Sequence, residues 1–232
     1  MYQADVLIYM RSLMCTGLKS PVDIASSSKD NCLYITSRDR ILRVDENGEV
    51  IVTWPTEDGG GTLSVTKDQM VILSVWAISA VREYSSNGKL IHEVRLPTDV
   101  HLLHAIKIKD HYAVSVESHM EHNVWAVDVT GSVIQAFNGE IKLPKYLAVN
   151  CDGCVFVMDQ ENSCVLLLSP TLVCLKVIVA TKDGLICPSR ICLDEASSRM
   201  FVADAGGHDV KVIAFALQKI QQPMHRIQEH IV

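Results

Sequence analysis

The sequence predicts an all-β protein, a β-propeller whose blades are four-stranded antiparallel sheets. Three observations carry this prediction: a strand-like segment recurs about every 40 residues, each interval holds four short apolar runs, and turn residues separate the runs. The composition is that of a globular domain, since 48% of the 232 residues are hydrophobic and 21% are charged. Four antiparallel strands per repeat, with no helical spacer, are typical of a propeller blade.

A short apolar strand sets the period of the repeat. Its five copies end at Ser37, Val75, Glu117, Asp159 and Asp204, which are 38, 42, 42 and 45 residues apart. A period of this size indicates a solenoid or a propeller, and the abundance of strand-like runs favours the propeller.

The first repeat shows how each blade is built. Its four runs are residues 22–25, 33–36, 41–44 and 50–53, and the last two are joined by Asp45-Glu46-Asn47-Gly48. Asn-Gly between two apolar runs predicts a hairpin with a type I′ turn, in which both central residues have positive φ. Equivalent turns are expected at residues 86–88, 129–131 and 169–171.

The number of blades follows from the two ends of the chain. The last repeat holds three runs, because residues 210–215 lead into 217–219 without a hairpin turn. The N-terminal part supplies one spare run, residues 5–10, which would close the ring and cover a sheet edge if it paired with the last blade. We therefore expect five blades within residues 1–217, with an incomplete six-bladed ring as the alternative.

The remaining segments indicate a cytoplasmic protein. The apolar residues 6–10 are too few for the core of a signal peptide or for a membrane span. The eight cysteines lie partly in apolar runs, as expected of reduced thiols. In the tail, residues 218–232, apolar residues at helical spacing are interrupted by Pro223, so that at most a short helix is expected.

Two segments carry a resemblance to a known repeat family. Residues 201–212 read Phe-Val-Ala-Asp-Ala-Gly-Gly-His-Asp-Val-Lys-Val, and residues 157–165 form a second copy that keeps the Asp and an Asn. An apolar strand, an Asp, a small polar loop with Asn-His and a second strand make up the NHL repeat. The chain thus resembles the NHL propellers of tripartite-motif (TRIM) proteins, although Gly207 and Asp209 stand where that pattern has Asn and Arg.

This resemblance implies a role in recruiting proteins. In TRIM-type ubiquitin ligases the propeller recruits a protein, or in some members RNA, while a zinc-binding RING domain transfers ubiquitin. The chain has no Cys and His run at RING spacing, so the resemblance implies a non-catalytic interaction platform and no enzyme. The alternatives are a metal-dependent, lactonase-like hydrolase, an RNA-binding propeller and a closed scaffold without an outside partner.

Candidate binding residues collect on one face of the expected ring. In an antiparallel four-stranded blade, the loop after the second strand and the loop between blades emerge on the same face. His101 and His104, which precede the third blade, are expected there too. The acidic and histidine residues of these loops in blades three to five are Glu117, His119, Glu121, His122, Asp159, Glu161, Asp204, His208 and Asp209.

Charge on this face indicates the kind of partner. Its acidic residues are Asp39, Glu57, Asp58, Asp99, Glu117, Glu121, Glu140, Asp159, Glu161, Asp183, Asp204 and Asp209. Its basic residues are Lys19, Arg38, Arg40, Lys142 and Lys182. Because this excess of acid repels phosphate, nucleic acid is not expected, and the partners are expected to be proteins with basic or apolar segments. Trp76 is expected to pack beside Val75 and Ala77 and not to stack on a nucleic-acid base.

No catalytic residue, metal or cofactor is expected. Cys151 and Cys154 form a CxxC without a second ligand pair nearby, and the intervening Asp-Gly fits a hairpin turn between the first two strands of blade four. Asp159 and Asp204 recur once per repeat, so they are interpreted as structural carboxylates that accept backbone N–H bonds. The histidine loops lack a fixed ligand spacing, and a metal site there stays the less favoured alternative.

Overall fold

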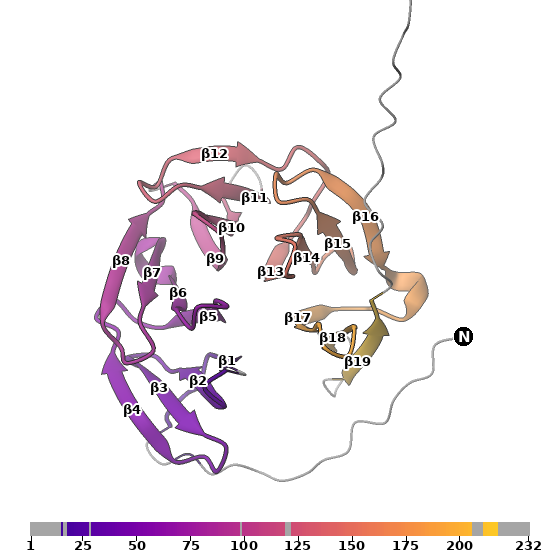
Figure 1. Cartoon of the computed structure of the whole chain (residues 1–232). Helices are drawn as coiled ribbons and strands as arrows, with labels where there is room; N and C mark the ends of the chain where they lie inside the picture. Colours follow the sequence, from indigo (N-terminus) through magenta and orange to yellow (C-terminus); the bar gives the residue numbers. More distant parts are fainter. Residues whose placement is uncertain are drawn as a thin grey trace, which may run out of the picture.

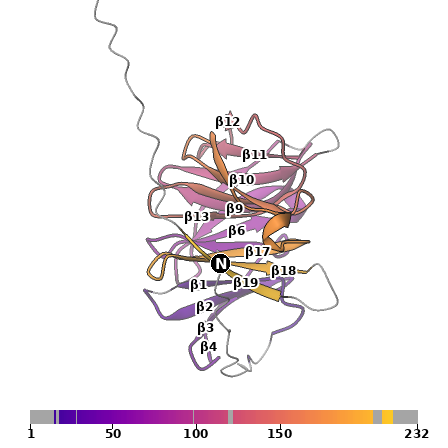
Figure 2. The same cartoon turned by 90° about the vertical axis from the view of Figure 1, so that its right-hand side faces the viewer.

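The chain folds into a ring of five antiparallel sheets around a central axis (Figure 1). The structure is a computed structural model, which describes residues 15, 18–27, 29–97, 99–118, 122–205 and 211–217. Figure 2 shows the ring from its edge, where the blades follow one another around the axis. The prediction of an all-β, five-bladed propeller is confirmed, and the only helices in the described residues are two short 3-10 turns, η1 (Trp76–Ile78) and η2 (Thr181–Asp183).

Strands pair in chain order within each blade, and the first strand lies nearest the axis. Blade 1 comprises β1 (Asp23–Ser27), β2 (Cys32–Thr36), β3 (Arg40–Asp45) and β4 (Val50–Pro55). Blade 2 comprises β5 (Gly61–Val65), β6 (Val71–Val75), β7 (Ala80–Tyr84) and β8 (Leu90–Arg95). Blade 3 comprises β9 (His101–Ile108), β10 (His111–Glu117), β11 (His122–Val127) and β12 (Val133–Ala136). Blade 4 comprises β13 (Pro144–Val149), β14 (Val155–Asp159), β15 (Cys164–Leu168) and β16 (Cys174–Val179). The described part of blade 5 comprises β17 (Pro188–Asp194), β18 (Arg199–Asp204) and β19 (Lys211–Ala216).

The core lies between neighbouring blades. Middle strands such as β6, β14 and β15 are buried along their whole length, because blades 2 and 4, which contain them, have a neighbouring blade on both faces. This explains why their sequences are continuous apolar runs without polar alternation. The outermost strand β12 is exposed at all four residues, since it has no further strand beside it.

The hairpins between the third and fourth strands lie where the sequence predicts them, but they are not type I′ turns. Gly48, Gly88 and Gly131 have φ of 87°, 86° and 92°, whereas the residue before each is not in the left-handed region. In each hairpin the left-handed residue donates its N–H to the carbonyl three residues earlier, as Gly88 does to Ser85 at 3.0 Å, and the strand register shifts nearby. A type I turn followed by a left-handed residue and a bulge has this geometry. It needs a single positive φ, which Leu172 supplies in blade 4 with φ 55°.

Two predicted segments, the closing strand at residues 5–10 and the tail at 218–232, lie outside the described residues. Within the described part, blade 5 has three strands, and blades 1 and 5 are joined at the axis by an ion pair between Asp23 and Arg190. None of the described helices is long and apolar enough to cross a membrane.

Candidate functional site

A cluster of polar groups fills the centre of the ring, and we call it the axial cluster. It takes one group from the first strand of every blade. These groups are the side chain of Asp23, the backbone of Leu63, and the side chains of His104, Tyr146 and Arg190.

Asp23 accepts hydrogen bonds from three other residues of the axial cluster. Its side chain is 3% exposed, and its carboxylate accepts the backbone N–H of Leu63 at 2.8 Å and Nε of Arg190 at 3.1 Å. The hydroxyl of Tyr146 lies 3.2 Å from the same carboxylate, and the Arg190 guanidinium lies 5.0 Å from the centroid of the Tyr146 ring. Burial and the neighbouring Asp23 raise the pKa of Tyr146, so the phenol stays protonated and acts as a donor. The buried charge of Asp23 is therefore fully compensated.

The hydrogen bonds of His104 define its tautomer. The backbone N–H of Leu147 lies 3.4 Å from Nδ1, so Nδ1 accepts, and Nε2 donates to the Leu63 carbonyl at 3.3 Å. The imidazole stacks on the Tyr146 ring with the centroids 3.8 Å apart. Because the side chain is wholly buried, desolvation lowers the pKa of His104 to about 4. Both imidazole nitrogens are therefore in hydrogen bonds, through which His104 connects blade 3 with blades 2 and 4.

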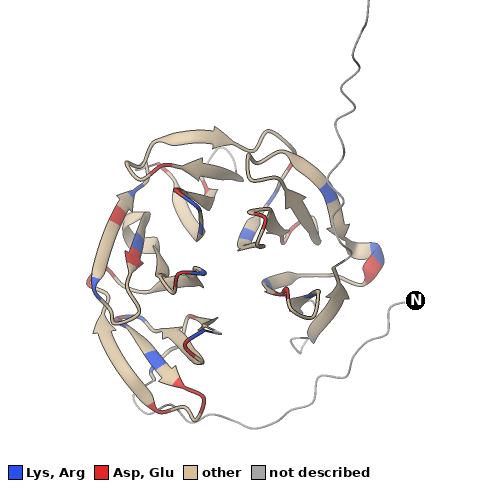
Figure 3. Ribbon diagram, viewed as in Figure 1, with Lys and Arg blue, Asp and Glu red and all other residues tan. Residues whose placement is uncertain are grey.

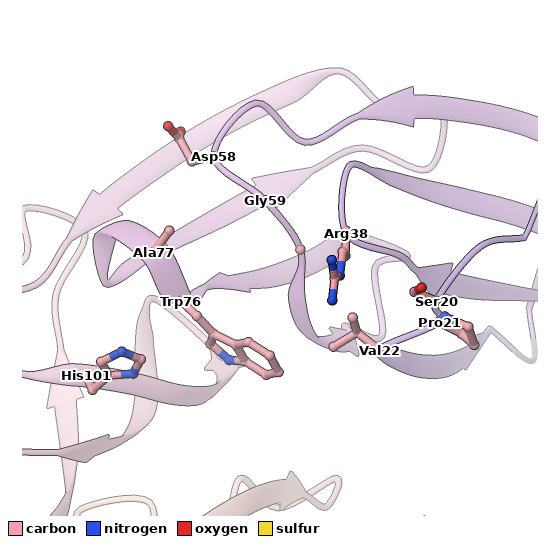
Figure 4. A pocket seen from close by; sticks show the side chains of 10 residues that line it. Ser20, Pro21, Val22, Arg38, Asp58, Gly59, Trp76, Ala77 and His101 are labelled. Atoms are coloured by element: carbon pink, nitrogen blue, oxygen red, sulfur yellow. The ribbon is translucent and has the colours of Figure 1, made fainter.

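A pocket of about 720 Å³ lies outside the axial cluster, none of whose residues lines it, and we call it the face pocket (Figure 4). It lies on the face that carries the loops between blades and the loops after each second strand. Its volume is in the range of small-molecule sites. The lining residues come from blades 1 to 3 and are Ser20, Pro21, Val22, Arg38, Asp58, Gly59, Gly60, Trp76, Ala77 and His101.

Trp76 forms the aromatic wall of the face pocket. The 3-10 turn η1 begins at this residue, and its indole N–H donates to the carbonyl of Leu103 in β9 at 3.1 Å. Figure 4 shows the half-buried ring extending into the space between His101 and Val22. The ring therefore lines the pocket, because its hydrogen-bond partner 27 residues further along the chain holds it there.

Asp58 and Arg38, the acidic and basic side chains of the face pocket, differ in their ion pairs with the other described residues. Its carboxylate, Asp58, forms an ion pair with Arg82, whose side chain is 7% exposed. Arg38 is exposed and forms no ion pair within the described part of the chain, while its neighbour Asp39 is held by Arg40 at 2.9 and 2.7 Å. The face pocket thus contains one guanidinium without an acidic partner among the described residues, while acidic and basic residues are interspersed around the ring (Figure 3).

Asp159 and Asp204 are buried at the ends of the second strands of their blades. The Asp159 carboxylate accepts the backbone N–H of Lys142 at 3.1 Å and of Leu143 at 2.9 Å. Asp204 holds residues 186–187 in the same way, at 3.0 and 2.6 Å. Each carboxylate fixes the loop that leads into its own blade, which is a structural role. Because both carboxylates are buried, they do not belong to the exposed negative charge of this face.

The other predicted site residues are only partly brought together. Glu117 and His122 face each other across β10 and β11, with Oε1 and Nε2 3.5 Å apart, and Glu161 is exposed on the loop after β14. None of the described members of the predicted set lines the face pocket. Its remaining members, His119, Glu121, His208 and Asp209, lie outside the described residues.

The described residues contain no group of three or more His, Cys, Asp or Glu side chains placed to hold a metal ion. The CxxC lies on a hairpin between β13 and β14, as predicted. Asn150 accepts the N–H of Asp152 at 3.1 Å and of Cys154 at 2.8 Å, and Gly153 takes φ 82°. The geometry is that of a turn.

Sequence reasoning missed the axial cluster and the face pocket, although a signal for the cluster was present. Asp23, His104 and Arg190 are titratable residues in first strands, although each of these strands holds further polar residues. Their recurrence in strands nearest the axis would have indicated a shared polar centre, because the first strands of all blades converge there.

Comparison with known proteins identifies the fold. No family model matches the sequence, and no curated protein matches it either. A protein of unknown function from Bacteroides caccae is similar in structure, with TM-score 0.68 and 13% identity over 82% of this chain and 72% of that chain. A streptogramin B lyase has TM-score 0.58 and 12% identity, over 87% and 70% of the two chains. A virginiamycin B lyase from Staphylococcus aureus has TM-score 0.57 and 12% identity, over 85% and 70%.

These findings correct one expectation and leave another without support. The expectation that the chain is not an enzyme is contradicted, because two of the similar structures are named as lyases. At 12% identity they show a shared fold and assign no activity to this chain. Nothing in the comparisons supports an NHL or TRIM relationship. The chain is a five-bladed β-propeller.

Proposed function

We propose that this propeller binds a small molecule in the face pocket. The observation that carries the proposal is that two side chains line the same pocket of about 720 Å³: Arg38, which has no ion-pair partner among the described residues, and Trp76, which is held by the Leu103 carbonyl. Small-molecule sites are typically concave and mostly apolar, with a few polar groups that orient the ligand. The face pocket has this composition.

The walls of the face pocket are held in place before a ligand arrives. The Trp76 ring is tied to β9, and the loop before β5 packs so closely on blade 1 that a Cβ at Gly60 would lie 2.1 Å from the Ser37 carbonyl oxygen. The axial cluster joins the first strands of the blades that carry the lining. A preformed site favours binding because little conformational freedom is lost when the ligand enters.

The proposal is tested by screening a chemically diverse fragment library that includes neutral, cationic and anionic members. Binding is followed by two-dimensional NMR through the indole N–H signal of Trp76, which is assigned with Trp76→Phe. Mass spectrometry of the same mixtures shows whether any bound fragment is chemically converted. We expect a subset of fragments to shift the Trp76 signal.

Two matched variants locate the binding. Ala77 is an exposed residue of the lining, and Ala196 is an exposed alanine outside it. Ala77→Phe is expected to abolish the shifts by filling the face pocket, while Ala196→Phe leaves them unchanged. The proposal fails if no fragment reaches Trp76 or if the two variants bind alike.

A second candidate function is recruitment of a protein, as the resemblance implies. The exposed carboxylates around the face pocket favour it, since the side chain of Asp39 is 63% exposed and that of Glu117 is 46% exposed. Such a surface attracts segments that carry Lys or Arg. A pull-down with tagged protein should then recover partners that are lost at high salt and with Glu117→Lys combined with Glu161→Lys. Equal recovery under all conditions would contradict it.

A further inference from the structure

We infer that the ligand of the face pocket is a flat, conjugated small molecule that carries one anionic group, either a carboxylate or a phosphate. The inference rests on the proposed function, because it names the class of molecule that the same pocket takes. It follows from what Trp76, Arg38 and Asp58 each leave available to a ligand.

Trp76 leaves the face of its ring available. Its single donor, the indole N–H, is used by the Leu103 carbonyl at 3.1 Å. One edge of the ring packs on Gly61, where a Cβ would lie 3.5 Å from the indole Cδ1. A ring whose donor is satisfied and whose edge is packed offers a ligand its π-surface, which favours offset stacking with another flat ring.

Arg38 has no side-chain hydrogen bond or ion pair with any other described residue, so its guanidinium is available to a ligand. Figure 4 shows its side chain directed toward the same space as the Trp76 ring. The nearest acid in sequence, Asp39, is bound at both oxygens by Arg40. A free guanidinium is planar and presents paired N–H donors, which match the two oxygens of a carboxylate or phosphate.

Asp58, in contrast, is not available to a cationic ligand. Arg82 binds its carboxylate and also donates Nε to Glu93 at 2.6 Å. Drawing Asp58 away would leave the buried Arg82 less compensated, which is unfavourable. Figure 4 shows Asp58 directed away from Trp76 and Arg38. The pocket therefore selects against cations and for anions.

The test compares five probes built on similar two-ring frameworks. The flat anions are 2-naphthoate and 2-naphthyl phosphate, the flat neutral probe is 2-naphthamide, the flat cation is 2-naphthylmethylammonium, and the saturated anion is decalin-2-carboxylate. Dissociation constants are measured by calorimetry and by the Trp76 indole signal. We expect a flat anion to bind about 10-fold more tightly than the neutral and cationic probes, as a charge-assisted hydrogen bond requires. We expect it to bind about 3-fold more tightly than the saturated anion, as ring stacking requires.

Variants assign these preferences to residues. Arg38→Gln is expected to weaken 2-naphthoate about 10-fold, to the level of the amide, because the charge is removed. Lys142→Gln is the control, since it removes an exposed positive charge that does not line the face pocket. Trp76→Leu is expected to abolish the preference for the flat over the saturated anion.

The outcomes separate this inference from the proposed function. If fragments bind in the face pocket but anions or flat rings have no advantage, the ligand class is overturned and the pocket stands. An equal effect of Arg38→Gln and Lys142→Gln also overturns it. If no molecule reaches the face pocket at all, the proposed function itself fails. If the inference holds, the ratio of the dissociation constants of 2-naphthoate and 2-naphthyl phosphate shows which anion the site prefers.

Discussion

At the scale of single residues, His104 shows how position in the fold determines chemistry. Its imidazole is wholly buried, stacks on Tyr146 and has both nitrogens in hydrogen bonds. Protonation would turn Nδ1 into a donor facing the N–H of Leu147, so the folded protein keeps this histidine neutral. A histidine that looks in the sequence like a member of a binding loop is instead part of the axial cluster.

This environment makes the stability of the protein pH-dependent. The pKa of His104 is lowered from 6.5 to about 4 in the folded state. Between these values the unfolded state binds the proton and the folded state does not, so the free energy of unfolding falls as pH drops through this window. The full shift corresponds to a loss on the order of 3 kcal/mol.

Urea unfolding at several pH values between 7 and 4 measures this loss. Exposed carboxylates contribute to the same slope, so the wild type is compared with His104→Gln, which should flatten it. The exposed His101→Gln should leave it unchanged. Equal slopes for all three proteins would show that His104 is not responsible.

At the scale of secondary-structure elements, the hairpin turns determine where each blade can fold back. The left-handed conformation at Gly88 is required by the bulged type I turn, and a Cβ there would lie 2.7 Å from the Trp54 ring. Gly184 has a similar φ of 95° at the end of η2, but nothing lies within 4 Å of its Cβ position.

Substituting these two glycines distinguishes the loss of stability caused by backbone strain from the loss caused by a steric clash. Gly184→Ala should cost about 1 kcal/mol, the usual difference for a left-handed residue. Gly88→Ala should cost about 1–3 kcal/mol more, because Trp54 must shift within a packed core. Chemical denaturation of both variants measures the difference. Equal losses would show that the Trp54 contact is relaxed at little cost.

The strands and turns also show how much of the fold could be predicted from the sequence. The runs expected at residues 33–36 and 41–44 lie within β2 and β3, because apolar patterning and turn residues are local signals. The turn type was wrong because Asn-Gly fits either a type I′ turn or a type I turn with a bulge. The role of Trp76 could not be predicted, since its position depends on a carbonyl in another blade.

At the scale of the whole molecule, the axial cluster joins blades that are far apart in sequence. Asp23 is bonded to Tyr146 and Arg190, which are 123 and 167 residues away. No local pattern predicts such pairs. Because they connect the first blade with the last two, the axial cluster is expected to contribute to closing the ring.

Asp23→Asn should therefore destabilise the protein by about 1–3 kcal/mol, a range reduced from that of fully buried pairs because the Arg190 side chain is 37% exposed. Combining it with Arg190→Gln should cost less than the sum of the two single variants. The exposed pair Asp39 and Arg40 serves as the control, with a coupling below about 1 kcal/mol. Strict additivity of Asp23→Asn and Arg190→Gln would contradict a direct interaction.

Closure by the N-terminal segment stays a prediction from the sequence. Blade 5 has three strands in the described residues, whereas the other blades have four. If residues 5–10 supply the missing strand, deletion of residues 1–12 should abolish cooperative unfolding, because an open ring exposes a sheet edge. A truncated protein that melts like the full chain would show that the ring closes without this segment.

The measurement that tests the central claim most directly is a crystal structure of the protein soaked with 2-naphthoate. The account predicts electron density in the face pocket, with the ring stacked on Trp76 and the carboxylate bonded to the guanidinium of Arg38. Density only at other sites, or a molecule in the pocket whose carboxylate points away from Arg38, would contradict it.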